Sequence, residues 1–208
     1  MKRSLIIGVT GQTGAGKSTV CDAMRKNGAA VINADKVARE VMTAGSPCVS
    51  ALAKAFGEDI LDSQGAIIRP VLAERAFADR HSTDMLSSIT HPFIISKTQE
   101  YIHEFLNKHY DVIVFDAPQL FESGGDSLCD KVIAVTAPED VRKCRIMRRD
   151  NIDEKSAMQR ICAQHDSRYY TDRADLVIDG TLSFDEAADK AIKFTERLLS
   201  RNNEESYL

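Results

Sequence analysis

The segment "GVTGQTGAGKST" at residues 8–19 constrains the fold of this chain more than any other feature. It matches the pattern G-x-x-x-x-G-K-[ST], in which Gly11 and Gly16 are the spaced glycines and Lys17 and Ser18 follow them. Apolar residues precede the segment, and apolar residues at helical spacing come after it. The sequence therefore predicts a phosphate-binding loop that connects a strand to a helix.

The residues of this loop suit the phosphates of a nucleoside triphosphate. Glycine permits the tight turn that points successive backbone N–H groups into one concavity, and the following helix adds its positive end. Lys17 would reach the β- and γ-phosphates, and the Ser18 hydroxyl is suited to holding Mg²⁺. A glycine-rich turn without a ligand is the alternative, but it fits an isolated G-x-G better. The expected nucleotide contacts are Gly14, Ala15, Gly16, Lys17, Ser18 and Thr19.

Composition limits the class of protein and its partners. The chain has 208 residues, 43% hydrophobic and 28% charged, which suits one globular domain with room for a small inserted subdomain. Its net charge of −4 does not indicate a nucleic-acid or membrane surface. The five cysteines are scattered, and no apolar run has the length of a signal peptide or membrane span. We therefore expect a cytoplasmic monomer or weak homo-oligomer that acts on small molecules.

Strand and helix patterns alternate along the chain, which predicts a parallel sheet covered by helices. Apolar runs such as "VIVF" and "VIAV" are typical of strands buried on both faces. Residues 42–110 are mostly helical in pattern, with an expected break at "ITHP", where Pro92 would begin a new helix. The strand candidates are residues 5–9, 30–33, 112–116, 131–136 and 176–178.

Ligands of open α/β sheets bind at the carboxyl ends of strands, so residues just after each strand are site candidates. Asp35 follows the second strand, where it could be a helix N-cap or first-turn carboxylate and also a functional group, since both roles can coexist in one residue. Asp116 ends the third strand, where P-loop enzymes often keep a carboxylate associated with Mg²⁺. His91 is equally compatible with a core or capping role and with a ligand contact.

Three arginines follow the fourth strand. Arg142, Arg145 and Arg149 are spaced i, i+3 and i+7, which predicts one face of a helix. Such a stripe is usually a solvated surface. Beside a P-loop, however, nucleotide kinases carry a mobile lid whose arginines bind phosphates, so both interpretations stay open.

Eight motifs follow one another along the chain: "GVTGQTGAGKSTV", "VINADKVARE", "FGEDILDSQGAIIR", "ITHP", "PQLFESG", "RIMRRD", "RICAQ" and "ADLVIDG". In this order they resemble the dephospho-coenzyme A kinase family, from residue 5 to about residue 180. The resemblance implies a P-loop nucleoside monophosphate kinase fold with a five-stranded parallel sheet. The single domain would have its core at about 4–36, 111–140 and 174–200, a helical substrate-binding region at about 37–110 and a lid at about 141–170.

The same resemblance implies an activity and roles for individual residues. The family uses ATP and Mg²⁺ to phosphorylate the ribose 3′-hydroxyl of dephospho-coenzyme A, the last step of coenzyme A biosynthesis. By position, Lys17 and Ser18 would hold the ATP phosphates and Mg²⁺, and Asp35 would accept the proton of the 3′-hydroxyl. Arg145 and Arg149 would close over the phosphates. The residues implied on the coenzyme side are Arg69, His91 and Phe121.

Some positions depart from the family pattern, and two other functions compete with it. Asn33, Gln119 and Asp179 stand where family members usually have aspartate, leucine and asparagine. A regulatory GTPase would use "DSQG" at residues 62–65 as D-x-x-G, but the base-reading N-K-x-D is missing. Another small-molecule kinase of the same fold would explain the P-loop and lid but not the ordered "ITHP" and "PQLFE".

Overall fold

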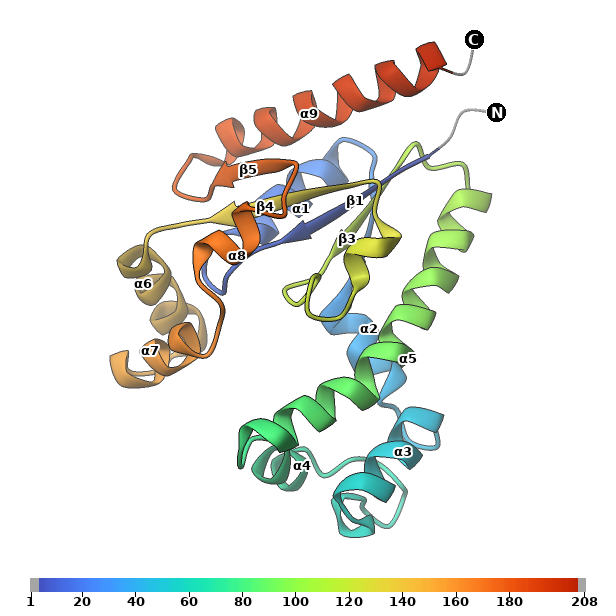
Figure 1. Ribbon diagram of the computed structural model, residues 1–208, viewed down its shortest axis with the longest axis vertical. Helices are drawn as coiled ribbons and strands as arrows, with labels where there is room; N and C mark the ends of the chain where they lie inside the picture. The colour runs from blue at the N-terminus through green and yellow to red at the C-terminus, as the bar shows by residue number, and fades with distance from the viewer. Residues whose placement is uncertain (1–3, 206–208) are drawn as a thin grey trace. The chain divides into compact units, whose positions relative to one another are not determined.

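The computed structural model describes residues 4–205, with side chains described through residue 200. The chain divides into two compact units. The P-loop unit comprises Met1–Ile32 and Glu104–Leu208, and the helical unit comprises Asn33–His103. Figure 1 shows the sheet in the first unit and only helices and connecting segments in the second.

A five-stranded sheet in the order β2-β3-β1-β4-β5 forms the centre of the P-loop unit. The pairings of β1 with β3, of β1 with β4 and of β4 with β5 are parallel. This arrangement confirms the predicted α/β fold with a five-stranded parallel sheet. The strands are β1 (Leu5–Thr10), β2 (Ala30–Asn33), β3 (Val112–Asp116), β4 (Lys131–Thr136) and β5 (Leu176–Asp179).

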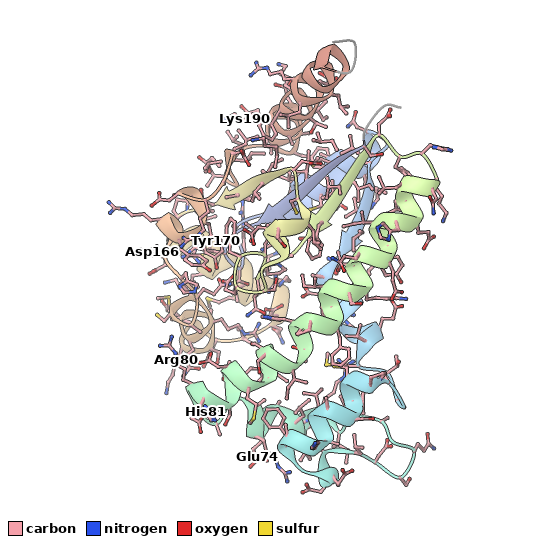
Figure 2. The ribbon with its side chains drawn as sticks, turned by 45° about the vertical axis from the view of Figure 1, so that its right-hand side comes forward. Glu74, Arg80, His81, Asp166, Tyr170 and Lys190 are labelled. Carbon is pink, nitrogen blue, oxygen red and sulfur yellow. The ribbon has the colours of Figure 1, made fainter. Side chains whose placement is uncertain are left out.

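Successive side chains along each strand point to opposite faces of this sheet. Ile7 and Val9 are fully buried on the face that also receives apolar side chains of α1 and α9. Gly8 points to the opposite face, where a Cβ would lie 2.7 Å from Leu120 Cδ2. Tyr170 of α8, which Figure 2 labels, is fully buried as well. The helices of this unit are α1 (Lys17–Lys26), α6 (Glu139–Asp150), α7 (Glu154–Cys162), α8 (Ser167–Thr171) and α9 (Phe184–Glu205), with a short 3₁₀ turn at Gly125–Leu128.

The helical unit has its own apolar core, in which Leu52, Ile60 and Ala76 are fully buried. Ser46 caps α3, because its Oγ accepts a hydrogen bond from Val49 N at 3.2 Å. The unit contains α2 (Ala34–Val41), α3 (Pro47–Phe56), a 3₁₀ turn at Glu58–Ile60, α4 (Arg69–Ala76) and most of α5 (Arg80–Asn107).

The expected helix break at "ITHP" is wrong. α5 runs without interruption through Pro92, and Figure 1 shows one helix that bends along its length. Proline removes one backbone donor and displaces the carbonyl four residues earlier, so it kinks a helix that other interactions hold together. Thr90 and Thr98, the buried side chains on either side of Pro92, show how closely this stretch of α5 is packed.

No helix among the residues that the structure describes is long and apolar enough to cross a membrane.

Candidate functional site

The predicted phosphate-binding loop forms directly between β1 and α1. Gly11, Gly14 and Gly16 have φ values of 136°, 76° and 109°, which favour glycine strongly. Steric contact also requires glycine at position 11, since a Cβ there would lie 2.1 Å from the carbonyl oxygen of Val135. The loop closes through a hydrogen bond from Ala15 N to Gln12 O at 3.1 Å. The motif glycines are therefore needed for the backbone path of the loop itself.

Lys17 and Asp116 bring opposite charges to this end of the sheet. Lys17 Nζ donates to Gly11 O at 2.8 Å, so the ammonium group reaches back across the loop. Asp116 ends β3 in register with Val9, the residue before the last of β1. Both charges act on the buried thiol of Cys21, whose pKa is raised by burial and by Asp116 and lowered by Lys17. Ser18, in the first turn of α1, is exposed.

The loop is also anchored to the connection between α7 and α8. The Gln12 side chain, which is buried, donates through Nε2 to His165 O at 2.9 Å. Thr13 N donates to Gln164 Oε1 at 2.7 Å. The sequence contained a signal for this contact in "RICAQ", which ends at Gln164, but spacing alone gave that glutamine no role.

Arg145 holds the other side of the loop. Its Nη1 donates to Gly14 O and Ala15 O, both at 3.2 Å, and its Nη2 donates to Gly180 O at 2.8 Å. Arg149 is placed differently, because its guanidinium pairs with Asp150 at 2.8 and 2.9 Å and its side chain is 60% exposed. The two arginines therefore make different contacts although both belong to α6.

The interpretation of the arginine stripe as one solvated face is wrong for Arg142. Its side chain is only 5% exposed, and Nε and Nη1 are buried without a hydrogen-bond partner. Burial lowers the pKa of Arg142, while the nearby Glu139 and the Tyr170 phenol act in the opposite direction. Residue 142 lies one turn into α6, where the helix passes the loop, and a Cβ on Gly14 would be 3.1 Å from its Cα.

Phe121 lies in an aromatic cluster beside α8. Its ring meets Tyr169 edge-on at 6.0 Å, and Tyr169 stacks on His165 at 3.8 Å. Arg173 lies over the Tyr169 ring at 4.3 Å. Asp166 fixes the start of α8 by accepting a hydrogen bond from Tyr169 N at 3.0 Å, and Figure 2 labels it there. Phe121 thus makes an edge-on aromatic contact that sequence spacing did not predict.

The helical unit holds the other candidate residues. Asn33 caps α2, since its Oδ1 accepts a hydrogen bond from Lys36 N at 3.0 Å, so the N-cap interpretation of Asp35 is wrong. Asp35 is exposed in the first turn of that helix. Arg69 is exposed at the first position of α4. His91 is half-buried in the middle of α5, which rules out a capping role for it.

The "DSQG" segment has a structural role in the same unit. Asp62 Oδ1 accepts hydrogen bonds from Gln64 N and Ala66 N, both at 2.9 Å, and closes a turn beside the bridge between Leu61 and Ile67. This turn explains the segment without a GTPase function. Among the described residues, no group of three or more His, Cys, Asp or Glu could hold a metal ion.

Comparisons with known proteins agree with this geometry. Residues 5–186 match the family model described as dephospho-CoA kinase. A protein from Syntrophotalea carbinolica named dephospho-CoA kinase is 36% identical over 195 residues, which cover 94% of this chain and 92% of the relative.

Two solved structures are similar to this chain over nearly its whole length. A Thermus thermophilus protein superimposes with a TM-score of 0.77 at 28% identity, covering 95% of this chain and 99% of that one. Dephospho-CoA kinase from Campylobacter jejuni superimposes with a TM-score of 0.68 at 27% identity, covering 95% of this chain and 98% of that one.

Proposed function

The chain belongs to the dephospho-CoA kinase family, and we propose specific roles in that reaction for residues of each unit. The enzyme transfers the γ-phosphoryl group of ATP to dephospho-coenzyme A, the final step of coenzyme A biosynthesis. In this transfer a bond forms between the ribose 3′-oxygen and the γ-phosphorus. The bond from that phosphorus to the ADP oxygen breaks, and the hydroxyl proton must be accepted.

The P-loop would hold the ATP phosphates through the backbone of Gly14, Ala15, Gly16, Lys17, Ser18 and Thr19. The positive φ values of Gly14 and Gly16 and the reach of Lys17 Nζ to 2.8 Å from Gly11 O support this role. The oxygen groups of Ser18 and Asp116 fit a hard cation, so they would hold Mg²⁺. Bound there, Mg²⁺ would neutralise charge on the phosphate oxygens.

Asp35 would accept the proton of the 3′-hydroxyl. Its exposure and its freedom from the capping role, which Asn33 fills, support this assignment. A carboxylate that receives the proton as the new bond forms contributes roughly 10²- to 10⁴-fold in rate. Arg69, His91 and Phe121 would contact the coenzyme.

Arg145 and Arg149 would act from the lid, formed by α6, α7 and α8. Guanidinium groups neutralise the transferring phosphoryl group through paired hydrogen bonds. For Arg145, a phosphate would replace at least one of the carbonyl acceptors it now has on the loop. Closure would also exclude water, which competes with the acceptor for ATP. We further propose that the enzyme works in the cytoplasm as a monomer or weak homo-oligomer without nucleic-acid partners.

The observation that carries these roles is the loop geometry around Gly11, Gly14 and Gly16 within a chain that matches one kinase family over residues 5–186. The test is to incubate the protein with Mg·ATP and, separately, dephospho-coenzyme A, adenosine or AMP, and to identify the products by mass. Phosphorylation of dephospho-coenzyme A alone is expected. Turnover of AMP without turnover of dephospho-coenzyme A would favour another small-molecule kinase.

The Asp35 role has its own test. Asp35→Asn should lower kcat roughly 10²- to 10⁴-fold with little change in substrate binding. Asp84→Asn, which changes an exposed carboxylate of the same unit, is the matched control and should behave like the parent. Turnover of Asp35→Asn within a few-fold of the parent would remove the proton-accepting role and make Asp116 the next candidate.

A further inference from the structure

Two adjacent residues of the phosphate-binding loop exchange hydrogen bonds with two adjacent residues of the α7–α8 connection. The buried Gln12 side chain donates through Nε2 to His165 O at 2.9 Å. In the other direction, Thr13 N donates to Gln164 Oε1 at 2.7 Å. Each segment therefore contributes one side-chain amide and one backbone group. We call this reciprocal contact, between Gln12–Thr13 and Gln164–His165, the amide clamp.

The α7–α8 connection is itself held in place, so it can support the loop. Gln164 N donates to Ile161 O at 3.2 Å, next to the end of α7. The His165 ring stacks on Tyr169 at 3.8 Å. Asp166, which Figure 2 labels, is the N-cap of α8. Both lid residues of the amide clamp thus belong to a segment that other contacts fix.

The amide clamp affects which N–H groups of the loop are available to a ligand. Thr13 N is engaged by Gln164 Oε1. Among residues 4–200, by contrast, no acceptor pairs with the N–H groups of Gly14 and Gly16. Phosphate is bound by such N–H groups when they point into one concavity. Because the Gly14 N–H belongs to the peptide group that follows Thr13, fixing Thr13 limits the directions in which the Gly14 N–H can point.

From these contacts we propose that Gln164 is a positioning residue for phosphoryl transfer. Its amide oxygen holds Thr13, so that the N–H groups which follow in the loop face the phosphates of the nucleotide. This role deepens the proposed function and rests on it. Gln164 Oε1 is an acceptor, as phosphate oxygens are, so it offers them no hydrogen bond and acts through the loop backbone.

The same contact allows an opposite role, in which Gln164 Oε1 competes with phosphate for the Thr13 N–H and weakens nucleotide binding. The reciprocal geometry favours support over competition. Gln12 Nε2 donates to a backbone carbonyl, and its side chain is buried, so a phosphate does not replace that bond. The bond from Gln12 to His165 therefore keeps Thr13 beside Gln164 when a nucleotide is present.

Nucleotide binding to Gln164→Met is the direct test. Methionine has a similar length and lacks the amide oxygen. Mg·ADP is the probe, because its β-phosphate reaches the loop and its binding requires neither acceptor nor turnover. We expect its Kd, measured by isothermal titration calorimetry, to rise about three- to tenfold, which is the effect of one hydrogen bond. Gln159→Met, which changes an exposed glutamine of α7, is the matched control and should bind like the parent.

A double-mutant cycle tests whether the two amides act as one unit. Gln12→Met removes the other half of the amide clamp. If both halves hold the same stretch of backbone, the double variant should bind Mg·ADP at most about twofold more weakly than the weaker of the two single variants. Effects of the two substitutions that multiply would mean independent contacts and would contradict the amide clamp.

Two further measurements separate positioning from a general loss of structure. In Gln164→Met, KM for ATP should rise with the Kd of Mg·ADP, while KM for dephospho-coenzyme A stays within about twofold of the parent. Amide hydrogen exchange at Thr13, followed by NMR, should become about tenfold faster, whereas the amides of β1 keep the protection of the parent. Equal rises of KM for both substrates would indicate a structural role alone.

These measurements can overturn the proposal. An unchanged Kd for Mg·ADP in Gln164→Met would remove the positioning role, and tighter binding would assign Gln164 to competition with phosphate. Unchanged exchange at Thr13 would mean that the contact does not form in solution. Failure of the parent protein to phosphorylate dephospho-coenzyme A would contradict the proposed function instead, and the Mg·ADP measurements would still decide the role of Gln164.

Discussion

Replacing Arg142 by methionine should stabilise the protein. The side chain is 5% exposed, and two of its donors, Nε and Nη1, are buried without acceptors. Each buried unsatisfied donor costs about 1–3 kcal/mol, and more when the group is charged. Methionine keeps an unbranched apolar stem of similar length and removes the charge and the donors. Apolar replacements of buried charged groups are often neutral or stabilising by about 1–4 kcal/mol.

From two unsatisfied donors, partly offset by the attraction of Glu139 and Tyr170, we expect a net gain of about 1–3 kcal/mol. In a chain of this size each kcal/mol raises Tm by about 2–4 °C, so the shift should be several degrees. The assay is thermal unfolding followed by circular dichroism. Arg148→Met, an exposed position of the same helix, is the matched control and should stay within about 0.5 kcal/mol of the parent.

The pH dependence adds a second criterion. Burial lowers the pKa of Arg142 in the folded protein, so folding is disfavoured while the group is charged. The cost is complete below the folded pKa and is lost as pH rises from the folded pKa to the higher unfolded pKa. Arginine remains charged throughout the neutral range, so Arg142→Met should gain the same stability at about pH 6 and about pH 9. A loss of 1 kcal/mol or more in Arg142→Met would refute the reasoning, because it would mean that the guanidinium has a strong partner.

Three further results are expected. Lys17→Ala should lower turnover on the order of 10²-fold or more with an unchanged Tm, and near-normal turnover would contradict the role of Lys17 at the phosphates. Arg149→Lys keeps the charge but loses the planar guanidinium, so turnover should fall at constant Tm, whereas full activity would indicate a solvated side chain. Alkylation with iodoacetamide followed by mass spectrometry should modify the exposed Cys144 and Cys162 before the half-buried Cys129, whose pKa is raised to about 12 by desolvation; early modification of Cys129 would contradict this raised pKa.

The sheet and the phosphate-binding loop could be predicted because their determinants are local. β-branched runs such as Val112–Asp116 have few alternatives to a buried strand, and the φ values of Gly11, Gly14 and Gly16 depend on glycine at those positions. Local propensity also explains the main error in the fold. Pro92 favours a helix start, but tertiary packing of α5 outweighs one missing backbone hydrogen bond.

Sequence patterns could not predict contacts between segments that are distant in the chain. The hydrogen bond between Thr13 and Gln164 joins residues 151 positions apart, and no periodicity relates them. Helical spacing put Arg142 on a face with two other arginines, but the spacing could not tell which part of that face meets the loop. Arg39 and Arg69 line one cavity of the helical unit, and this pairing depends on how α2 and α4 pack, which single-sequence patterns do not determine.

Gly180, the residue after β5, packs directly against the backbone of the phosphate-binding loop. A Cβ at this position would lie 1.7 Å from the carbonyl oxygen of Ala15, and Gly180 O also accepts the Nη2 hydrogen bond of Arg145. The conformation of residues 8–19 therefore depends on residues far away in the sequence. A fragment that keeps residues 8–19 but ends before Gly180 would contain the complete motif. It would lack the backbone contact of Gly180 with Ala15.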